Sequence, residues 1–408
     1  MPTQPVSIPT KRGYTLAGSL ELPVGLVRGS AIYAHCFTCT KQSRAAVEVS
    51  RALAREGIAT LRFDFSGLGG SGGDFGRAGF ASDIEDLVAS ADFLSERYGP
   101  GMLLVGHSLG GAAVLAAAGM LRPGKVAAIA TIGAPADVPH VLGNIHGDLA
   151  AIERDGEGEV EIGGRHYNLS REFLERTEHI DLLAEVSGLR VPLLLCHAPT
   201  DETVGVENAG KLFEAAKHPK SFLSLPGADH LLLDPSDADF AASMIARWAG
   251  RYLPLRAKYP SPADGVKVRT GNGKFGVEVY SASHAFLADE PATVGGEDAG
   301  PTPYDLLLSA LGTCTAMTMK MYAAHKGYPL VSAQVSVRHE RDHKPDAECH
   351  EHAMETGGKV QALYRRITLE GPELTAEERD RIVAIADKCP VHRTLEGELH
   401  IHTESADD

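Results

Sequence analysis

Between residues 12 and 253, short apolar runs typical of strands alternate along the chain with segments of helical periodicity. This alternation constrains the fold most, because repeated strand–helix–strand units build a parallel sheet with helices on both faces. The expected strands are 31–34, 59–63, 102–105, 126–132, 193–196 and 222–225. The expected helices are 44–56, 82–98, 112–120 and 237–248. The first part of the chain is therefore predicted to be an α/β fold with a mostly parallel sheet.

Residues 136–189 interrupt this alternation. They contain a predicted hairpin at 160–167 with Gly163-Gly164 at its tip, followed by a helix that opens at Ser170. An insertion between core strands is suited to cover a substrate pocket. We expect residues 136–189 to form a cap that sets the size of the substrate.

A proline-punctuated linker, Leu253-Pro254 through Pro262, closes the first part of the chain. Beyond it the pattern becomes α+β, with strands and two helices in separate runs. The strands are expected at 266–270, 275–281, 331–340 and 360–370, and the helices from Pro303 and from Thr375. We therefore assign residues 1–254 to one domain and residues 255–408 to a second.

Composition limits the partners and the compartment. The 408 residues are 43% hydrophobic and 23% charged, and the net charge of −15 argues against nucleic acid or an anionic membrane as a partner. The N-terminus lacks the pattern of a signal peptide and no apolar run is long enough to span a membrane, so we expect a cytoplasmic protein. Reduced thiols are then expected at all six cysteines, and any disulfide should be catalytic or redox-sensing rather than structural. These are Cys36, Cys39, Cys196, Cys314, Cys349 and Cys389.

A serine is set for nucleophilic attack in Gly106-His107-Ser108-Leu109-Gly110, which lies between a predicted strand and a predicted helix. Such a serine needs a base to remove its proton and an acid to orient that base. Asp201 follows the strand at 193–196, and His230 follows the strand at 222–225. Asp229 is an alternative acid, but a neighbour in sequence rarely points back at the His230 ring.

At these residues the first 250 positions or so resemble the α/β-hydrolase family, especially its serine esterases. The resemblance implies Ser108 as nucleophile, His230 as base and Asp201 as acid, with no cofactor and a small-molecule ester as substrate. It also implies an oxyanion hole made by the backbone N–H groups of Leu109 and Phe37. The loop of Phe37 contains Cys36-Phe37-Thr38-Cys39, whose spacing also occurs in redox and zinc sites.

Two further cysteines indicate thiol chemistry in the second domain. Cys314 lies on the apolar stripe of the helix that begins near Pro303, and Cys389 ends the other helix. A reactive thiol and a resolving thiol together suffice to reduce a peroxide. Because Cys314 is mid-helix, the helix dipole cannot activate it, and a cation must come from elsewhere. A buried core cysteine is the alternative.

The segment 300–314, which ends in Gly312-Thr313-Cys314, and the segment Cys389-Pro390-Val391-His392-Arg393 resemble the OsmC/Ohr family. This resemblance implies an intertwined homodimer that reduces organic hydroperoxides, with Cys314 as the peroxidatic thiol, Cys389 as the resolving thiol and a thiol reductant as partner. The chain has Tyr304, followed by Asp305, where the family's peroxidases carry a Glu. Arg269 and Lys274 are the candidates for the activating cation. The alternative is a dimerisation or ligand-binding module attached to an esterase.

A dense run of metal-ligand types occurs at 339–343 and 349–352. Its spacing matches no closed zinc motif, so a solvated loop without metal is expected.

Overall fold

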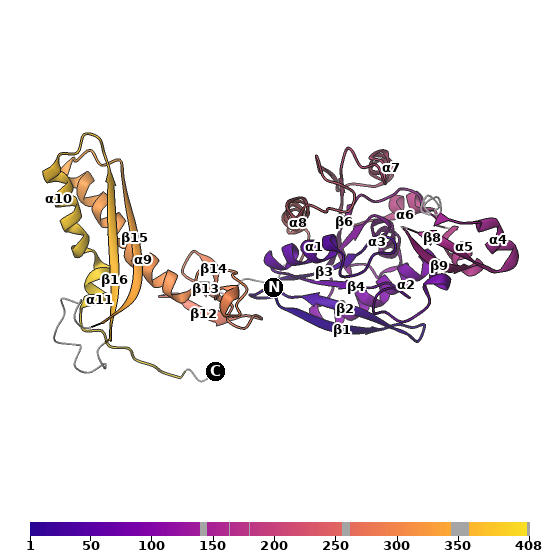
Figure 1. The fold of residues 1–408 in the computed structure, drawn as a ribbon, viewed down its shortest axis with the longest axis horizontal. Coiled ribbons are helices and arrows are strands. Elements are labelled where there is room, and N and C mark those ends of the chain that lie inside the picture. The colour runs from indigo at the N-terminus through magenta and orange to yellow at the C-terminus, as the bar shows by residue number, and fades with distance from the viewer. Residues whose placement is uncertain (139–144, 163, 179, 255–261, 344–358, 406–408) are drawn as a thin grey trace. The chain divides into compact units, whose positions relative to one another are not determined.

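The computed structural model describes residues 1–138, 145–162, 164–178, 180–254, 262–343 and 359–405. The chain divides into two units, Met1–Ala299 and Gly300–Asp408, each with its own core. In Figure 1 the first unit runs from indigo to light orange and the second from orange to yellow. Each is described by itself.

An eight-stranded sheet with the order β1-β2-β4-β3-β5-β6-β10-β11 forms the centre of the first unit. The strands from β4 to β11 are parallel, whereas β1 and β2 form an antiparallel edge. Their bounds are β1 Thr3–Pro9, β2 Thr15–Glu21, β3 Gly29–Ala34, β4 Ile58–Phe63, β5 Met102–His107, β6 Val126–Ile132, β10 Leu193–His197 and β11 Lys220–Ser224. The predicted α/β fold with a mostly parallel sheet is confirmed. The edge hairpin β1–β2 was not predicted.

Helices cover both faces of this sheet (Figure 1). They are α1 Arg44–Arg55, α2 Phe75–Tyr98, α3 Leu109–Met120, α7 Glu207–Ala215 and α8 Pro235–Ala249. One buried cluster joins α2 and α3 to one face of the sheet, and a second joins α1 and α8 to the other. Both faces of the central strands β3, β4 and β5 are therefore buried, which explains why their sequences are apolar without alternation.

The insertion at 136–189 folds into its own small layer. Its elements are β7 Ile145–His146, α4 Leu149–Asp155, β8 Glu157–Ile162, β9 Arg165–Ser170, α5 Arg171–Glu178 and α6 Leu182–Gly188. The hairpin predicted there is present, with Ile162 paired to Arg165. A separate buried cluster fills this layer and includes Phe173 of α5, against which Phe37 and Phe75 of the main body pack.

A three-stranded antiparallel sheet after the linker groups with the first unit rather than with the second. It consists of β12 Lys267–Thr270, β13 Val277–Tyr280 and β14 Ala285–Ala288. Glu278 accepts a hydrogen bond from the Leu26 amide at 2.9 Å, and Asn272 donates to the carbonyls of Pro23 and Gly25. Packing thus divides the chain at 299/300, whereas the linker suggested 254/255.

The second unit is built on the long helix α9 Pro303–Lys326, which packs on a two-stranded sheet. Its strands are β15 Ser332–His343 and β16 Lys359–Glu370, and its remaining helices are α10 Ala376–Ala384 and α11 Pro390–Glu396, joined by a 3-10 turn at Ile385–Lys388. The helix predicted from Thr375 is present as α10, and a capping box between Thr375 and Glu378 opens it. Among the described residues, no helix has the length and apolar character that crossing a membrane would require.

Candidate active sites

Ser108 occupies a sharp turn between β5 and α3. Its φ of 54° and ψ of −124° lie outside the regions that side chains prefer, so the turn is strained. The flanking glycines make this turn possible, because a Cβ on Gly110 would lie 2.4 Å from the carbonyl oxygens of Ala34 and His35. The turn lifts the Ser108 hydroxyl away from the backbone at the carboxyl edge of the sheet.

The three side chains predicted to act together are brought together. The Ser108 hydroxyl donates to Nε2 of His230 at 2.9 Å, and Nδ1 of His230 donates to Oδ2 of Asp201 at 2.7 Å. Asp201 follows β10, and His230 follows β11. Because parallel strands end at the same edge of the sheet, three residues separated by up to 122 positions meet there. A chain of this kind can transfer the serine proton to the imidazole.

Asp201 is buried and held by backbone donors. Oδ1 of Asp201 accepts the N–H groups of Thr203 and Val204, each at 2.9 Å. Burial alone would raise the pKa of Asp201, but the hydrogen bonds from His230, Val204 and Thr203 and the nearby His230 charge outweigh it and lower the pKa. Asp229, the alternative acid, is exposed and accepts the amides of Leu231 and Leu233 instead. The geometry therefore favours Asp201.

A second histidine, His107, holds the backbone of His230. The sequence analysis did not predict this role. Nε2 of His107 lies 2.6 Å from the carbonyl oxygen of His230. Burial, assisted by the His230 charge, lowers the pKa of His107 to about 4, so its ring is neutral at physiological pH and donates this bond. In the sequence, only the position of His107 directly before Ser108 could have indicated this role.

The loop after β3 carries the predicted oxyanion donor at Phe37. The Phe37 N–H has no acceptor among the described residues. Leu109 is the first residue of α3, where an N–H has no acceptor within the helix. Phe37 and Leu109 line one small cavity together. The two N–H groups are thus free to bind a developing oxyanion.

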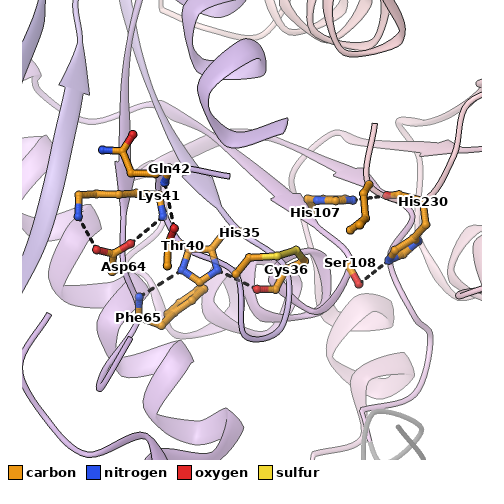
Figure 2. Close-up of a disulfide and its surroundings, with 12 residues drawn as sticks. His35, Cys36, Thr40, Lys41, Gln42, Asp64, Phe65, His107, Ser108 and His230 are labelled. Carbon is orange, nitrogen blue, oxygen red and sulfur yellow. Dashed lines mark hydrogen bonds and ion pairs between the residues drawn. A yellow bond between two sulfur atoms is a disulfide. The ribbon is translucent and has the colours of Figure 1, made fainter. Parts of the chain in front are cut away.

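Cys36 and Cys39 form a disulfide across this loop (Figure 2). The expectation of six reduced thiols was therefore wrong at these two positions. The tight turn through Phe37 and Thr38, with Thr38 at a φ of 55°, brings the two Cα atoms to 5.4 Å, within the range for a disulfide. The disulfide therefore restrains Phe37, whose backbone N–H is without an acceptor among the described residues.

A buried carboxylate anchors the far side of the same loop (Figure 2). Oδ1 of Asp64 accepts the Lys41 amide at 2.7 Å, Oδ2 of Asp64 accepts the Gly70 amide at 2.9 Å, and the Lys41 ammonium forms an ion pair with Asp64. The glycine-rich turn at 64–72 therefore has a structural role next to the site.

In the second unit, Cys314 of α9 lies close to Cys389 at the start of α11 and helps to lower the pKa of the Cys389 thiol. Cys389 is fully buried and Cys314 is half-buried. Burial raises the pKa of Cys389, but hydrogen bonds from the His392 amide, the Thr315 hydroxyl and Cys314, with the charge of Arg365, outweigh it. The net effect lowers the pKa of Cys389.

Arg365 of β16 is the cation beside the thiols, and the sequence analysis missed it. Its guanidinium donates to the Thr315 hydroxyl and the Ala386 carbonyl, each at 3.1 Å, and to Asp387 at 2.6 Å. It also lies 2.9 Å from Nδ1 of His392. The predicted candidates Arg269 and Lys274 belong to the other unit. Arg365 is 51 positions from Cys314 and 24 from Cys389, so no local motif indicated it.

Tyr304 and Asp305 do not supply a carboxylate to the thiols. Tyr304 stacks on His339 at 4.6 Å between ring centroids. Asp305 caps α9, where it accepts the amide and hydroxyl of Thr302. The run 349–352 lies outside the described residues, and within those described no group of His, Cys, Asp and Glu could hold a metal.

Comparison with known proteins gives two family matches. The model of the alpha/beta hydrolase family matches residues 29–297, and the model of OsmC-like proteins matches residues 295–404. Among solved structures, the esterase domain of a Rhodothermus marinus protein is 47% identical, covering 62% of this chain and 99% of that chain with a TM-score of 0.51. Est1E of Butyrivibrio proteoclasticus, bound to ferulic acid, is 23% identical with a TM-score of 0.53, and it covers 60% and 99%. The Est1E likeness indicates the fold alone.

Among curated proteins, the mitochondrial palmitoyl-protein thioesterase ABHD10 of Rattus norvegicus is 32% identical over 155 residues. This match covers 36% of this chain and 50% of the rat protein. The ABHD10 of Mus musculus is 31% identical over 170 residues, which are 39% of this chain and 54% of the mouse protein. The chain thus spans about half the length of the curated relatives it matches.

Proposed function

This chain belongs to the alpha/beta hydrolase family and continues into an OsmC-like domain, and on that premise we propose that its first domain is a carboxylesterase for small or medium acyl groups. The observation that carries the proposal is the continuous hydrogen-bonded chain from Ser108 through His230 to Asp201. Ser108 is the nucleophile, His230 the general base and Asp201 the group that orients His230.

In the proposed reaction, the Ser108 oxygen attacks the ester carbonyl while Nε2 of His230 takes the serine proton. The N–H groups of Phe37 and Leu109 stabilise the negative oxygen of the tetrahedral intermediate. His230 then returns the proton to the leaving alcohol, which leaves an acyl group on Ser108. A water molecule, deprotonated by His230, releases the acid and restores the serine.

Esters and thioesters suit this site better than amides, because their leaving groups need less protonation. The thioesterase name of the mammalian relatives supports including thioesters. The cavities beside Phe37 and Leu109 are narrow, with Phe75 and Phe173 packed in their walls, which favours short acyl groups over long chains. The cap at 136–189 supplies Phe173 and Thr177 to this boundary.

The test is hydrolysis of p-nitrophenyl acetate and butyrate, together with covalent labelling by a fluorophosphonate. The unaltered protein should turn over both esters and be labelled on Ser108. Ser108→Ala should lose both properties, with a fall in kcat of about 10⁴-fold or more. Cys196→Ser, at a buried cysteine with no place in the mechanism, is the matched control. Folded protein that is neither labelled nor active would mean that this domain binds an acyl ligand without cleaving it.

A second activity is supported by Arg365, whose charge helps to lower the pKa of Cys389 and whose guanidinium donates to the Thr315 hydroxyl beside that thiol. We propose that Cys314, the more exposed thiol, attacks an organic hydroperoxide as its thiolate. The O–O bond breaks, the alkoxide leaves and is protonated, and Cys314 becomes a sulfenic acid. Cys389 then attacks that sulfur and releases water, which forms a disulfide. A small-molecule thiol in the cytoplasm reduces the disulfide and completes the two-electron cycle.

The thiol unit also exposes large apolar side chains on α9, including Met317 at 64% and Met321 at 73%. Such a surface supports a homodimer formed through this unit. Addition of cumene hydroperoxide to reduced protein should consume two thiols per chain, and Cys314→Ser or Cys389→Ser should abolish this consumption. Thiols that survive the peroxide would leave the unit as a dimerisation or ligand-binding module.

A further inference from the structure

His197 is the last residue of β10 and is buried, with 1% of its surface exposed. Both neighbouring strands hold the backbone at this point. The His197 carbonyl accepts the Leu225 amide directly after β11, and the Cys196 carbonyl accepts the Gly133 amide directly after β6, each at 2.9 Å. The imidazole of His197 is therefore attached to a fixed point at the carboxyl edge of the sheet.

The ring of His197 closes the loop that carries Asp201. Nε2 of His197 lies 2.7 Å from the carbonyl oxygen of Val204, and because a carbonyl can only accept, Nε2 carries a proton and donates it. The same Val204 donates its own N–H to Oδ1 of Asp201 at 2.9 Å. Val204 thus lies between the two side chains, and the His197 bond joins the two ends of the loop 198–204.

The His197 ring also lies close to the Asp201 carboxylate itself. Its Nε2 is 3.7 Å from Oδ2 of Asp201, the oxygen that accepts the bond from His230. This distance is too long for a hydrogen bond, but it places a polarised N–H group beside a buried carboxylate. Burial raises the pKa of Asp201, and the hydrogen bonds from His230 and from the Val204 amide are the strongest effects that lower it. His197 therefore supports the charged form of Asp201.

Two buried histidines hold the two loops that meet at the serine. His107 bonds to the carbonyl of His230, whereas His197 bonds within the loop of Asp201. In the part of the chain that the structure describes, the Ser108 hydroxyl bonds to His230 and to neither of these two rings. His197 can therefore act on the reaction only through other residues.

We propose that His197 is a positioning residue that sets the orientation of Asp201 by fixing Val204 to the end of β10. This assignment rests on the proposed hydrolase function and adds a residue to it. With Val204 fixed, Oδ2 of Asp201 stays in line with Nδ1 of His230, which keeps the His230 ring turned toward Ser108. Without the His197 bond, the Val204 carbonyl would lose its donor in a buried position, and the loop would have to shift to satisfy it.

The experiment measures hydrolysis of p-nitrophenyl butyrate by His197→Leu and His197→Gln, with folding checked by circular dichroism. His197→Leu should lower kcat about 10- to 100-fold with KM changed less than about threefold, because the substrate still binds but the reacting groups are misaligned. His197→Gln keeps an N–H donor near the position of Nε2 and should stay within about fivefold of the unaltered kcat. Cys196→Ala, at the neighbouring buried position of β10, is the matched control.

A combination with Asp201→Asn separates positioning from a purely structural role. The rate of fluorophosphonate labelling of Ser108 is compared, because it remains measurable in slow variants. His197→Leu should lower this rate about 10- to 100-fold by itself but less than about threefold in the Asp201→Asn background, where the charge that it positions is already gone. A residue that only stabilises the fold would give the same loss in both backgrounds.

Equal losses in the two backgrounds, an unchanged kcat in His197→Leu, or equal losses in His197→Leu and His197→Gln would overturn the assignment while ester hydrolysis stands. Absence of both hydrolysis and Ser108 labelling in the unaltered protein would remove the hydrolase proposal and this one together.

Discussion

The two reactive centres are held in different ways. Ser108 lies on a strained turn at the edge of an eight-stranded sheet, and every group it contacts comes from the same unit. Cys314 lies on a regular helix over a two-stranded sheet, next to a small buried cluster that includes Met319 and Ile382. Strain at a reactive residue persists only where the surrounding structure is strong enough to impose it.

The serine site is therefore complete within one unit. The thiol unit, in contrast, has an exposed apolar surface on which its function can depend. At the serine site, the hydrogen bonds from Ser108 through His230 to Asp201 all lie within one unit. The thiol unit has its cation, Arg365, but leaves apolar side chains of α9 exposed, as Met317 and Met321 show. We therefore expect substitutions at the serine site to act on chemistry within one chain. The effects of substitutions in the thiol unit should also depend on which partner covers the exposed surface of α9.

The largest effect should come from the acid of the serine site. Asp201→Asn keeps the shape but removes the charge that holds the His230 tautomer, and kcat for ester hydrolysis should fall by about 10³- to 10⁴-fold. Asp229→Asn is the matched control, because Asp229 is exposed and bonded to backbone amides. A comparable loss in Asp229→Asn would mean that the acid has been misassigned.

Arg365 provides the corresponding test of the thiol unit. Arg365→Met should raise the pKa of Cys389 and lower its thiolate population at neutral pH about tenfold, since a neighbouring positive charge is lost. The thiolate absorbance, titrated as the difference from Cys389→Ser, measures this change. Arg366→Met, at the exposed neighbouring position on β16, should leave the titration in place. Equal titrations for Arg365→Met and the unaltered protein would contradict the assignment of Arg365.

A smaller effect is expected from the disulfide in the oxyanion loop. Cys36→Ser/Cys39→Ser should lower kcat about three- to tenfold with little change in KM, because a looser loop holds the Phe37 N–H less well. Dithiothreitol should reproduce this loss in the unaltered protein and have no effect on the double variant. Full activity of the double variant would show that Asp64 and Lys41 suffice to hold the loop.

The smallest effect concerns stability and pH. Burial lowers the pKa of His107 to about 4, below the value of about 6.5 expected in the unfolded chain. The unfolded state therefore binds more protons between these values, and the stability that His107 contributes is present above pH 6.5 and lost as the pH falls towards 4. His107→Asn should make the unfolding free energy depend less on pH in this window, as chemical denaturation would measure. An unchanged dependence would mean that His107 is already protonated in the folded state.

Most of the first unit could be predicted from sequence because its signals are local. Strands such as 126–132 are continuous apolar runs, and the glycines around Ser108 mark a turn that larger residues cannot form. The order of Ser108, Asp201 and His230, each after a strand, was enough to predict that they meet. In a parallel sheet the ends of the strands share one edge, so topology converts sequence order into proximity.

Other features depend on contacts that sequence spacing does not encode. Arg365 of β16 comes near Cys389 because its side chain bonds to Thr315 of α9 and lies beside His392 of α11. The sheet β12–β14 joins the first unit through contacts of Glu278 and Asn272 with residues 23–26. The disulfide between Cys36 and Cys39 could be recognised only from the path of the loop, since the Cys-x-x-Cys spacing alone is also compatible with free thiols.

The sequence by itself indicated the two families and the order of the domains, and it predicted that Ser108, Asp201 and His230 meet, because apolar periodicity and tight turns are properties of neighbouring residues. The tertiary structure alone decided which cation lies near Cys389 and which unit contains residues 262–299. Burial and charge at these positions arise from segments that are distant along the chain, and only folding brings them together.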